Sequence, residues 1–139
     1  MNDETFAYFF IEGFECDHSE VTHFLGLEPT EACNKGDVDG EERAEISSSW
    51  LLHSPLPKKT VFLDEHLETL LDILDTKSPE VLEMTRKYDC GINCIGKHFS
   101  PNPGVNLSKE LIRRLGFFEI SVDFDIYCNC EKCASMEVA

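Results

Sequence analysis

The sequence predicts a single α+β domain, and two patterns carry this prediction. From Phe117 to Asn129, apolar and polar residues alternate, which is typical of a strand with one buried and one solvated face. From Val61 to Asp75, leucines instead recur at helical spacing with acidic residues opposite. A chain of 139 residues is long enough for one domain with a proper core. We expect residues 130–139 to be a flexible tail.

The alternating strand separates an apolar side from an acidic side. We expect its apolar residues to be buried against the leucine stripe of residues 63–74; they are Phe118, Ile120, Val122, Phe124 and Ile126. The opposite side should be solvated, and it carries three carboxylates, Glu119, Asp123 and Asp125.

Local signals place the other elements. Residues 5–12 are apolar at both odd and even positions, which predicts a central strand covered on both faces. Asp17 and Glu20 form a capping box that starts a helix, and Gly26 ends it. The remaining predicted elements are a strand at 46–53, helices from 61 and from Ser78-Pro79, a strand at 91–99, and a helix between Ser108 and Gly116.

Two segments of the chain echo each other. SEVTHFLG at 19–26 and SKELIRRLG at 108–116 each follow a predicted strand, carry a capping signal and end in Leu-Gly. Two strand–helix–strand halves commonly form an antiparallel sheet of about four strands with helices packed on one face. We therefore expect a ferredoxin-like arrangement, with an extra helix from the leucine-rich pair.

The net charge of −15 is unevenly distributed, because residues 1–45 hold thirteen acidic residues against Lys35 and Arg43. Such a field disfavours nucleic acid and anionic membranes as partners and favours a basic protein. Alternatively, the charge only keeps the protein in solution. No apolar run approaches the ~20 residues of a membrane span. The N-terminus lacks the pattern of a secretory signal, so we expect a cytoplasmic location.

The seven cysteines are an odd number, which favours a reducing compartment. Cys128, Cys130 and Cys133 cluster near the C-terminus and could offer three thiolates to Zn²⁺, with Cys90 or His98 as a fourth ligand. The competing interpretation is a buried Cys128 followed by incidental exposed thiols. We expect no bound cofactor, with zinc as the alternative.

Catalytic patterns are weak, and we expect that the protein is not an enzyme. Asp123 and Asp125 would lie ~7 Å apart on an extended strand, but no partner histidine is identifiable. The five histidines lack zincin spacing. The fragment Asp37-x-Asp39-Gly40 lacks the later ligands of a calcium loop.

Several segments together resemble a bacterial family, domain of unknown function 4279. They are FLGLEPT at 24–30, KG at 35–36, SSW at 48–50, DEHL at 64–67 with LLD at 70–72, and FDIY at 124–127. The resemblance covers residues 5–128 and leaves out Cys130 and Cys133. Members occur among immunity-like genes beside bacterial toxins, so the resemblance implies a binding protein.

We therefore expect a cytoplasmic immunity or inhibitor protein that binds and neutralises a basic bacterial toxin, with a nuclease as the expected class. Its carboxylates would occupy the place of phosphates in an electropositive active site. The alternative from a different class is a small metal-binding or redox-sensing domain that uses the C-terminal cysteines. An enzyme with an unrecognised site is a third hypothesis.

Two acidic groups are candidates for the binding surface. The preferred group is an exposed loop, because such loops tolerate dense charge; its acidic residues are Asp37, Asp39, Glu41, Glu42 and Glu45. The second group is the strand face with Glu119, Asp123 and Asp125. Trp50 is expected in the core, with a role as a partner anchor as the alternative.

Overall fold

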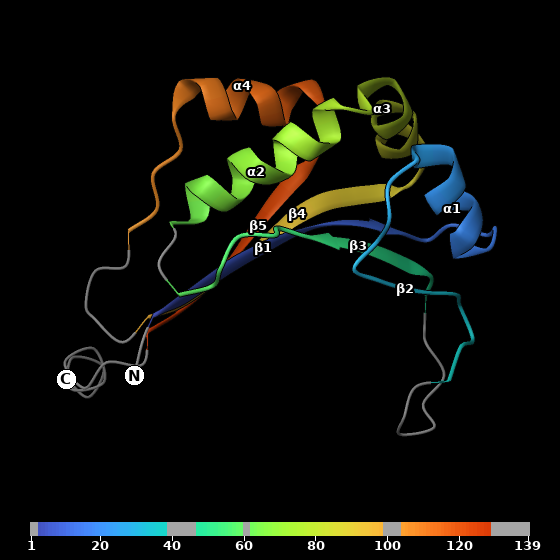
Figure 1. Cartoon of the computed structure of the whole chain (residues 1–139), viewed down its shortest axis with the longest axis horizontal. Coiled ribbons are helices and arrows are strands. Elements are labelled where there is room, and N and C mark those ends of the chain that lie inside the picture. Colours follow the sequence, from blue (N-terminus) through green and yellow to red (C-terminus); the bar gives the residue numbers. More distant parts are fainter. Residues whose placement is uncertain (1–2, 39–46, 60–61, 99–103, 129–139) are drawn as a thin grey trace.

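The computed structural model describes residues 3–38, 47–59, 62–98 and 104–128. It shows an α+β fold in which a five-stranded mixed sheet carries four helices on one face (Figure 1). The elements follow in the order β1 (Glu4–Glu12), α1 (His18–Leu25), β2 (Glu31–Cys33), β3 (Ser49–His53), α2 (Leu63–Asp75), α3 (Ser78–Lys87), β4 (Asp89–His98), α4 (Lys109–Phe117) and β5 (Ser121–Cys128). None of the described helices is long and apolar enough to span a bilayer.

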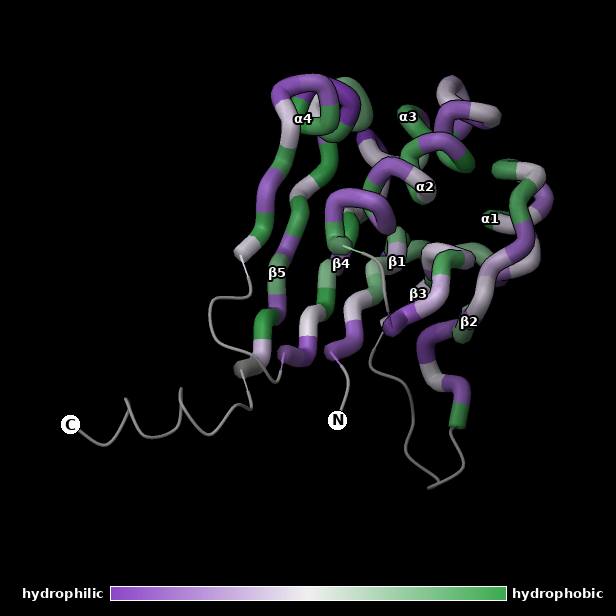
Figure 2. Tube along the Cα trace, turned by 60° about the vertical axis from the view of Figure 1, so that its left-hand side comes forward, coloured by the Kyte–Doolittle hydropathy of each residue, from purple (hydrophilic) through white to green (hydrophobic). Residues whose placement is uncertain are grey.

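The sheet has the strand order β2-β3-β1-β4-β5. The predicted central position of β1 is confirmed, because β1 pairs antiparallel with β3 on one side and with β4 on the other. The predicted covering of both its faces is wrong for the described residues, because the helices lie on one side in both views (Figure 2). Strand β2 is a short edge strand that the sequence patterns did not predict.

The sequence predicts two equivalent strand–helix–strand halves, but the position of the last strand differs from this prediction. Strands β4 and β5 are direct parallel neighbours in an unbroken register, so no strand of the other half lies between them. The sheet therefore has five strands of mixed direction, and a ferredoxin-like topology is not established. The extra helices α2 and α3 form part of the same helix layer (Figure 1).

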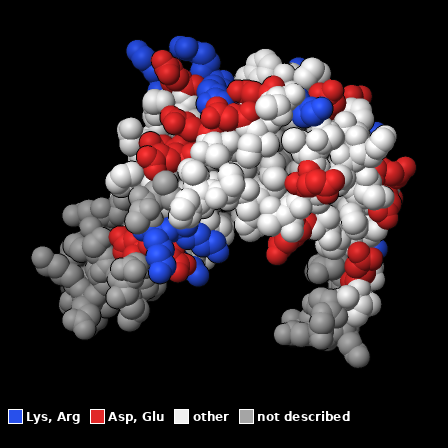
Figure 3. All heavy atoms as spheres, in the orientation of Figure 1, with Lys and Arg blue, Asp and Glu red and all other residues white. Residues whose placement is uncertain are grey.

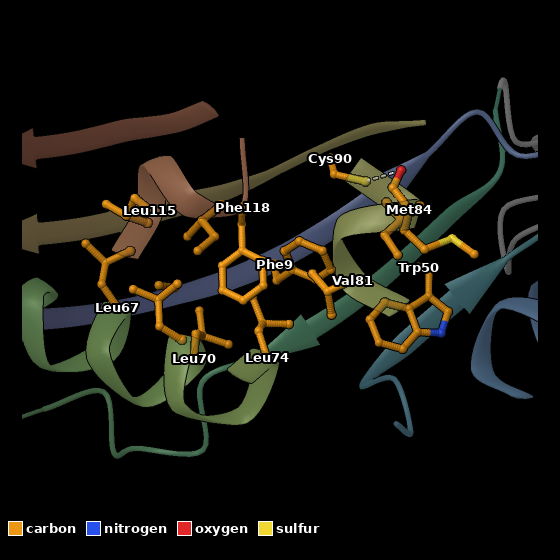
Figure 4. Close-up of a cluster of buried hydrophobic side chains, with 14 of the residues drawn as sticks. Phe9, Trp50, Leu67, Leu70, Leu74, Val81, Met84, Cys90, Leu115 and Phe118 are labelled. Atoms are coloured by element: carbon orange, nitrogen blue, oxygen red, sulfur yellow. Dashed lines mark hydrogen bonds between the residues drawn. The ribbon is translucent and has the colours of Figure 1, made fainter. Parts of the chain in front are cut away.

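The core lies between the helix layer and the sheet. The leucine stripe of α2 is buried as predicted, with Leu67, Leu70 and Leu74 fully inaccessible. These side chains face Phe9 of β1 and Phe118, which follows α4 (Figure 4). Trp50 is also fully buried and its indole Nε1 donates a hydrogen bond to Thr22 Oγ1 of α1 at 3.0 Å. Its predicted place in the core is confirmed, and because its side chain is inaccessible it cannot anchor a partner.

The capping signals at Asp17, Gly26 and Ser108 produced helix ends that the sequence predicted, whereas α3 has Lys77 rather than Ser78 as its N-cap and α4 continues past Gly116 to Phe117. Asp17 accepts a hydrogen bond from the backbone N–H of Ser19, and Glu20 reaches back to the backbone N–H of Asp17. Gly26 ends α1 at φ 69°, a conformation that suits glycine because it has no Cβ. Ser108 caps α4 by accepting from Leu111 N at 3.1 Å. These local bonds satisfy amide groups that a helix leaves without partners.

The strand that the alternating stretch predicts is longer than the strand observed. Helix α4 continues through Phe117, and Phe118 is buried at the end of that helix rather than on a strand. Strand β5 begins only at Ser121. Phe124 was expected in the core, but 39% of it is exposed. The physical reason is that β5 lies at the edge of the sheet, where only β4 flanks it.

Candidate partner-binding surface

The sheet face opposite the helices is a surface built by five strands. We call it the open face and define it by alternate residues that share a side through the strand register. Its members are Glu4, Phe6, Tyr8, Phe10 and Glu12 of β1; Glu31 and Cys33 of β2; Ser49, Leu51 and His53 of β3; Asp89, Gly91, Asn93, Ile95 and Lys97 of β4; and Ser121, Asp123, Asp125 and Tyr127 of β5.

Aromatic groups make up the centre of the open face. His53 stacks between Tyr8, at a centroid distance of 5.1 Å, and Phe6, at 6.4 Å. Lys58 Nζ lies 4.6 Å from the centre of the Phe6 ring. Asn93 Nδ2 donates to the Tyr8 hydroxyl at 2.9 Å, which joins β1 to β4. These contacts hold the rings in fixed positions, and a preorganised aromatic surface loses little side-chain entropy when a partner binds.

Carboxylates surround this aromatic centre. Six of the open-face positions are acidic and one is a lysine, Lys97; the acids are Glu4, Glu12, Glu31, Asp89, Asp123 and Asp125. At one end of β1, partial burial and the neighbouring carboxylate of Asp89 raise the pKa of Glu12. A cationic group placed there would relieve the repulsion between these two carboxylates. The surface therefore fits a partner that brings positive charge.

The predicted strand-face residues are only partly brought together. Asp123 and Asp125 lie on the open face, and both are exposed. Glu119 lies before β5 at φ 57°, and its carboxylate accepts a hydrogen bond from Arg86 Nε at 2.8 Å. Glu119 therefore belongs to a contact with α3 and not to the strand face. Among the described residues neither Asp123 nor Asp125 forms an ion pair.

Of the five acidic residues of the preferred loop, only Asp37 lies within the described residues. Asp37 is exposed and accepts a hydrogen bond from Asn34 N at 2.7 Å, which stabilises a turn. The other predicted loop residues, Asp39, Glu41, Glu42 and Glu45, lie outside the described residues. Their role in binding stays a prediction.

The cysteine cluster is described only at the backbone of Cys128, which ends β5. Cys130 and Cys133 lie outside the described residues. Of the two proposed fourth ligands, His98 is the register partner of Cys128, whereas Cys90 lies at the opposite end of β4. No group of three or more candidate metal ligands occurs within the described part of the chain.

The described core thiols are unreactive. Burial raises the pKa of Cys90 and of Cys94 to about 12, with a smaller contribution from Asp89 at Cys90. Cys90 Sγ donates to the carbonyl of Met84 at 3.4 Å, which ties β4 to α3 (Figure 4). Because the thiolate is the nucleophilic form, the raised pKa makes both thiols poor nucleophiles at neutral pH. Cys94 is buried and Cys16 is half-buried.

One polar pair that the sequence reasoning missed connects His66 with Ser54. The distance from His66 Nδ1 to Ser54 Oγ is 2.7 Å, which is short enough for a nucleophile and its base. However, His66 is fully buried and its pKa is lowered by burial. Ser54 Oγ also accepts from Leu56 N at 3.3 Å. The pair therefore ties the 54–59 segment to α2. Nothing in the local sequence signals this contact, because both residues meet only in the fold.

Acidic residues also cover the helix layer, and they spread over more of the visible surface than basic residues do (Figure 3). Part of this charge is neutralised within the fold: Arg114 Nη2 of α4 lies 2.8 Å from the carboxylates of Asp72 and of Asp75 on α2. The pKa of Arg114 is raised by these two hydrogen-bonded carboxylates against the opposing effect of burial. These pairs join two helices, so this part of the charge serves the fold.

Together these features define a small α+β domain with one helix-covered sheet face and one open, acidic and aromatic face. The chain belongs to the family Domain of unknown function (DUF4279), whose pattern matches residues 3–129. The family resemblance seen in the sequence is thus confirmed. Cys130 and Cys133 lie beyond the match. No curated protein and no solved structure matches the chain.

Proposed function

We propose that this chain is a protein-binding domain that engages a basic partner through its open face. The observation that carries the proposal is the combination of a fixed aromatic centre and six carboxylates on one sheet face that none of the described helices covers. A few side chains, enriched in tryptophan, tyrosine and arginine, supply most of the binding energy at protein interfaces, and surrounding charges speed association and select the partner.

The partner class that we propose is a bacterial toxin, and the domain would act in the cytoplasm as its immunity protein. The support is the family resemblance and the net charge of −15. A nuclease is the favoured class of toxin because its active site must attract phosphate. An acidic protein can cover such a site by placing carboxylates where phosphates bind, and the long-range field makes the encounter fast.

The geometry favours Asp123 and Asp125 over the acidic residues of the helix layer as contact residues. Both are exposed on the last strand and, within the described residues, form no ion pair. A partner lysine or arginine could therefore pair with them without breaking an internal bond. By contrast, Asp72 and Asp75 are already paired with Arg114.

A growth experiment tests the function. The protein encoded by the adjacent reading frame in the source genome is expressed in a bacterial host, with and without this chain. The wild-type chain should restore growth, whereas the charge-reversed variant Asp123→Lys with Asp125→Lys should not. The control is Glu68→Lys with Glu83→Lys, which changes the net charge equally on exposed positions of α2 and α3.

A second variant separates the open face from the acidic loop. Asp39→Lys with Glu42→Lys alters only the loop. If the loop variant loses protection while the open-face variant keeps it, the loop is the contact surface and the open face is not. If the chain does not protect against the adjacent protein, that toxin is not its partner and the proposed function fails.

A further inference from the structure

Strand β5 is a long edge strand. It pairs over its eight residues with β4, and the strand order places no strand on its other side. Alternate residues of a strand direct their N–H and C=O groups to the same side, so one set of these groups points away from β4. Among the described residues no backbone hydrogen bond reaches this outer edge.

The two edges of the sheet differ in ways that matter for pairing. The opposite edge, β2, has only three residues. Strand β5 contains neither proline nor glycine, residues that commonly interrupt pairing at edge strands. It also exposes large side chains on both faces, with Tyr127 53% exposed on the open face and Phe124 39% exposed on the helix face. Such an edge can accept a further strand.

We infer that the outer edge of β5 binds an extended, basic segment of the partner protein as a sixth strand. This inference rests on the proposed function and specifies how the partner is held. The added strand would take its affinity from main-chain hydrogen bonds and its selectivity from alternate side chains. Lysine or arginine at every second position would meet Asp123 and Asp125, and apolar residues between them would meet Phe124.

Charge repulsion disfavours a second copy of this chain as the added strand. An antiparallel pairing of two β5 strands centred on Phe124 would place the carboxylates of positions 123 and 125 opposite those of the other copy. Like charges directly opposite each other destabilise a strand pair. The same two aspartates that repel a copy attract a basic segment, so they select the partner and keep the free chain from pairing with itself.

Synthetic peptides added to the full chain test the inference. The first is an eight-residue peptide of alternating lysine and valine, which matches the length of β5. The second has the same sequence with two adjacent central amides N-methylated. Each edge of the peptide strand then lacks one N–H donor, while the charge of the peptide is unchanged. The third replaces lysine by glutamate. Affinity is measured by calorimetry, and amide hydrogen exchange locates the contact.

The lysine peptide should bind and slow amide exchange within β5. N-methylation should weaken binding about tenfold or more, because backbone hydrogen bonds are lost and the methyl groups obstruct pairing. The glutamate peptide should not bind. Equal affinity of the two lysine peptides, or protection confined to strands other than β5, would overturn the inference.

Two further outcomes keep this inference separate from the proposed function. If both lysine peptides bind equally and the open-face variant still fails to protect cells, the acidic face acts by charge alone; the function then stands and the added strand does not. If sedimentation shows that the free chain is a dimer with protected β5 amides, a second copy occupies the edge and the inference is wrong.

Discussion

The ring of Phe10 occupies the space that a side chain at its register partner Gly91 would need. An added Cβ at Gly91 would lie 2.9 Å from Phe10 Cζ and 2.9 Å from the backbone oxygen of Ser121. The missing side chain therefore lets Phe10 lie across β4 toward β5. Phe10 is 7% exposed although it lies on the open face, so this contact closes part of that face.

Replacing Gly91 by alanine should lower the free energy of unfolding by about 1–3 kcal/mol, because the new methyl group meets a backbone atom that cannot move away. The matched control is Gly116→Ala in α4, where a Cβ meets nothing within 4 Å. That change should be neutral or stabilise by up to about 1 kcal/mol. Chemical denaturation of both variants measures the difference, and equal effects would contradict the close contact at Gly91.

Two phenylalanines that the sequence predicts to be buried on strands should differ in their contribution to stability. Phe9→Ala should cost ~3–5 kcal/mol, because Phe9 is fully buried among the leucines of α2. Phe124→Ala should cost at most about 2 kcal/mol, because its ring is partly solvated. Equilibrium unfolding in urea checks both values. A larger loss for Phe124 than for Phe9 would place β5 within the core.

The stability of α1 should depend on the ionisation of Asp17. Hydrogen bonds from Ser19 N, from Asn34 and from the Ser19 hydroxyl lower the pKa of Asp17 from 3.8 to about 2. Since the pKa is lower in the folded state, the stabilisation is complete above the ordinary value and is lost as the pH falls through about 2.

The variant Asp17→Asn retains an oxygen that can cap the helix but does not titrate. Between pH 4 and pH 2 the wild type should therefore lose more thermal stability than this variant does. Carbon-13 NMR of the Asp17 carboxylate measures the pKa directly. A titration midpoint at the ordinary value of 3.8 would show that the capping bonds do not persist in solution.

Bound zinc should be sub-stoichiometric in protein purified without chelator. The physical reason lies at His98, the described ligand candidate beside Cys128. Its Nδ1 lies 3.5 Å from Asp3 Oδ2, and its Nε2 would lie 2.7 Å from a Cβ at Gly96. The imidazole is thus turned back over its own strand, away from the strand end.

Elemental analysis checks this prediction, with Cys130→Ser plus Cys133→Ser and the separate variant His98→Gln for comparison. One zinc ion per chain that disappears in both variants would contradict it. Such a result would favour the metal-binding alternative, with His98 as the fourth ligand.

The parts of the fold that the sequence predicts correctly are those set by neighbouring residues. The capping box of Asp17 and Glu20, the end of α1 at Gly26 and the buried stripe of α2 each depend on contacts within a few positions. Strand identity follows from alternation in the same way. These signals do not reveal which strands become neighbours.

The errors arise where partners distant in the sequence decide the structure. The alternation of β5 continues back through Glu119 to Phe118 as on a longer strand, but α4 extends to Phe117 and Phe118 is buried directly after this helix. The edge position of β5 exposes Phe124, and the hydrogen bond with Arg86 holds Glu119 apart from Asp123. On the open face, Asp123 and Asp125 could be predicted from alternation, whereas the stack of Tyr8, His53 and Phe6 required the strand register.

The most direct test of the open face as a binding surface is the association rate with the protein of the adjacent reading frame. It is measured by stopped flow at low and at high salt for the wild type, for Asp123→Lys with Asp125→Lys, and for Glu68→Lys with Glu83→Lys. Circular dichroism first establishes that all three chains fold. Exposed charges act over about 10 Å at 0.1 M salt, so differences should appear mainly at low salt.

The open-face variant should associate at least about tenfold more slowly at low salt and lose most of its salt dependence, since the attracting charges lie at the contact. The helix-layer variant should be slowed much less, although its net charge is the same. Equal slowing of both variants would mean that only the total charge matters, and that result would contradict the open face as the binding surface.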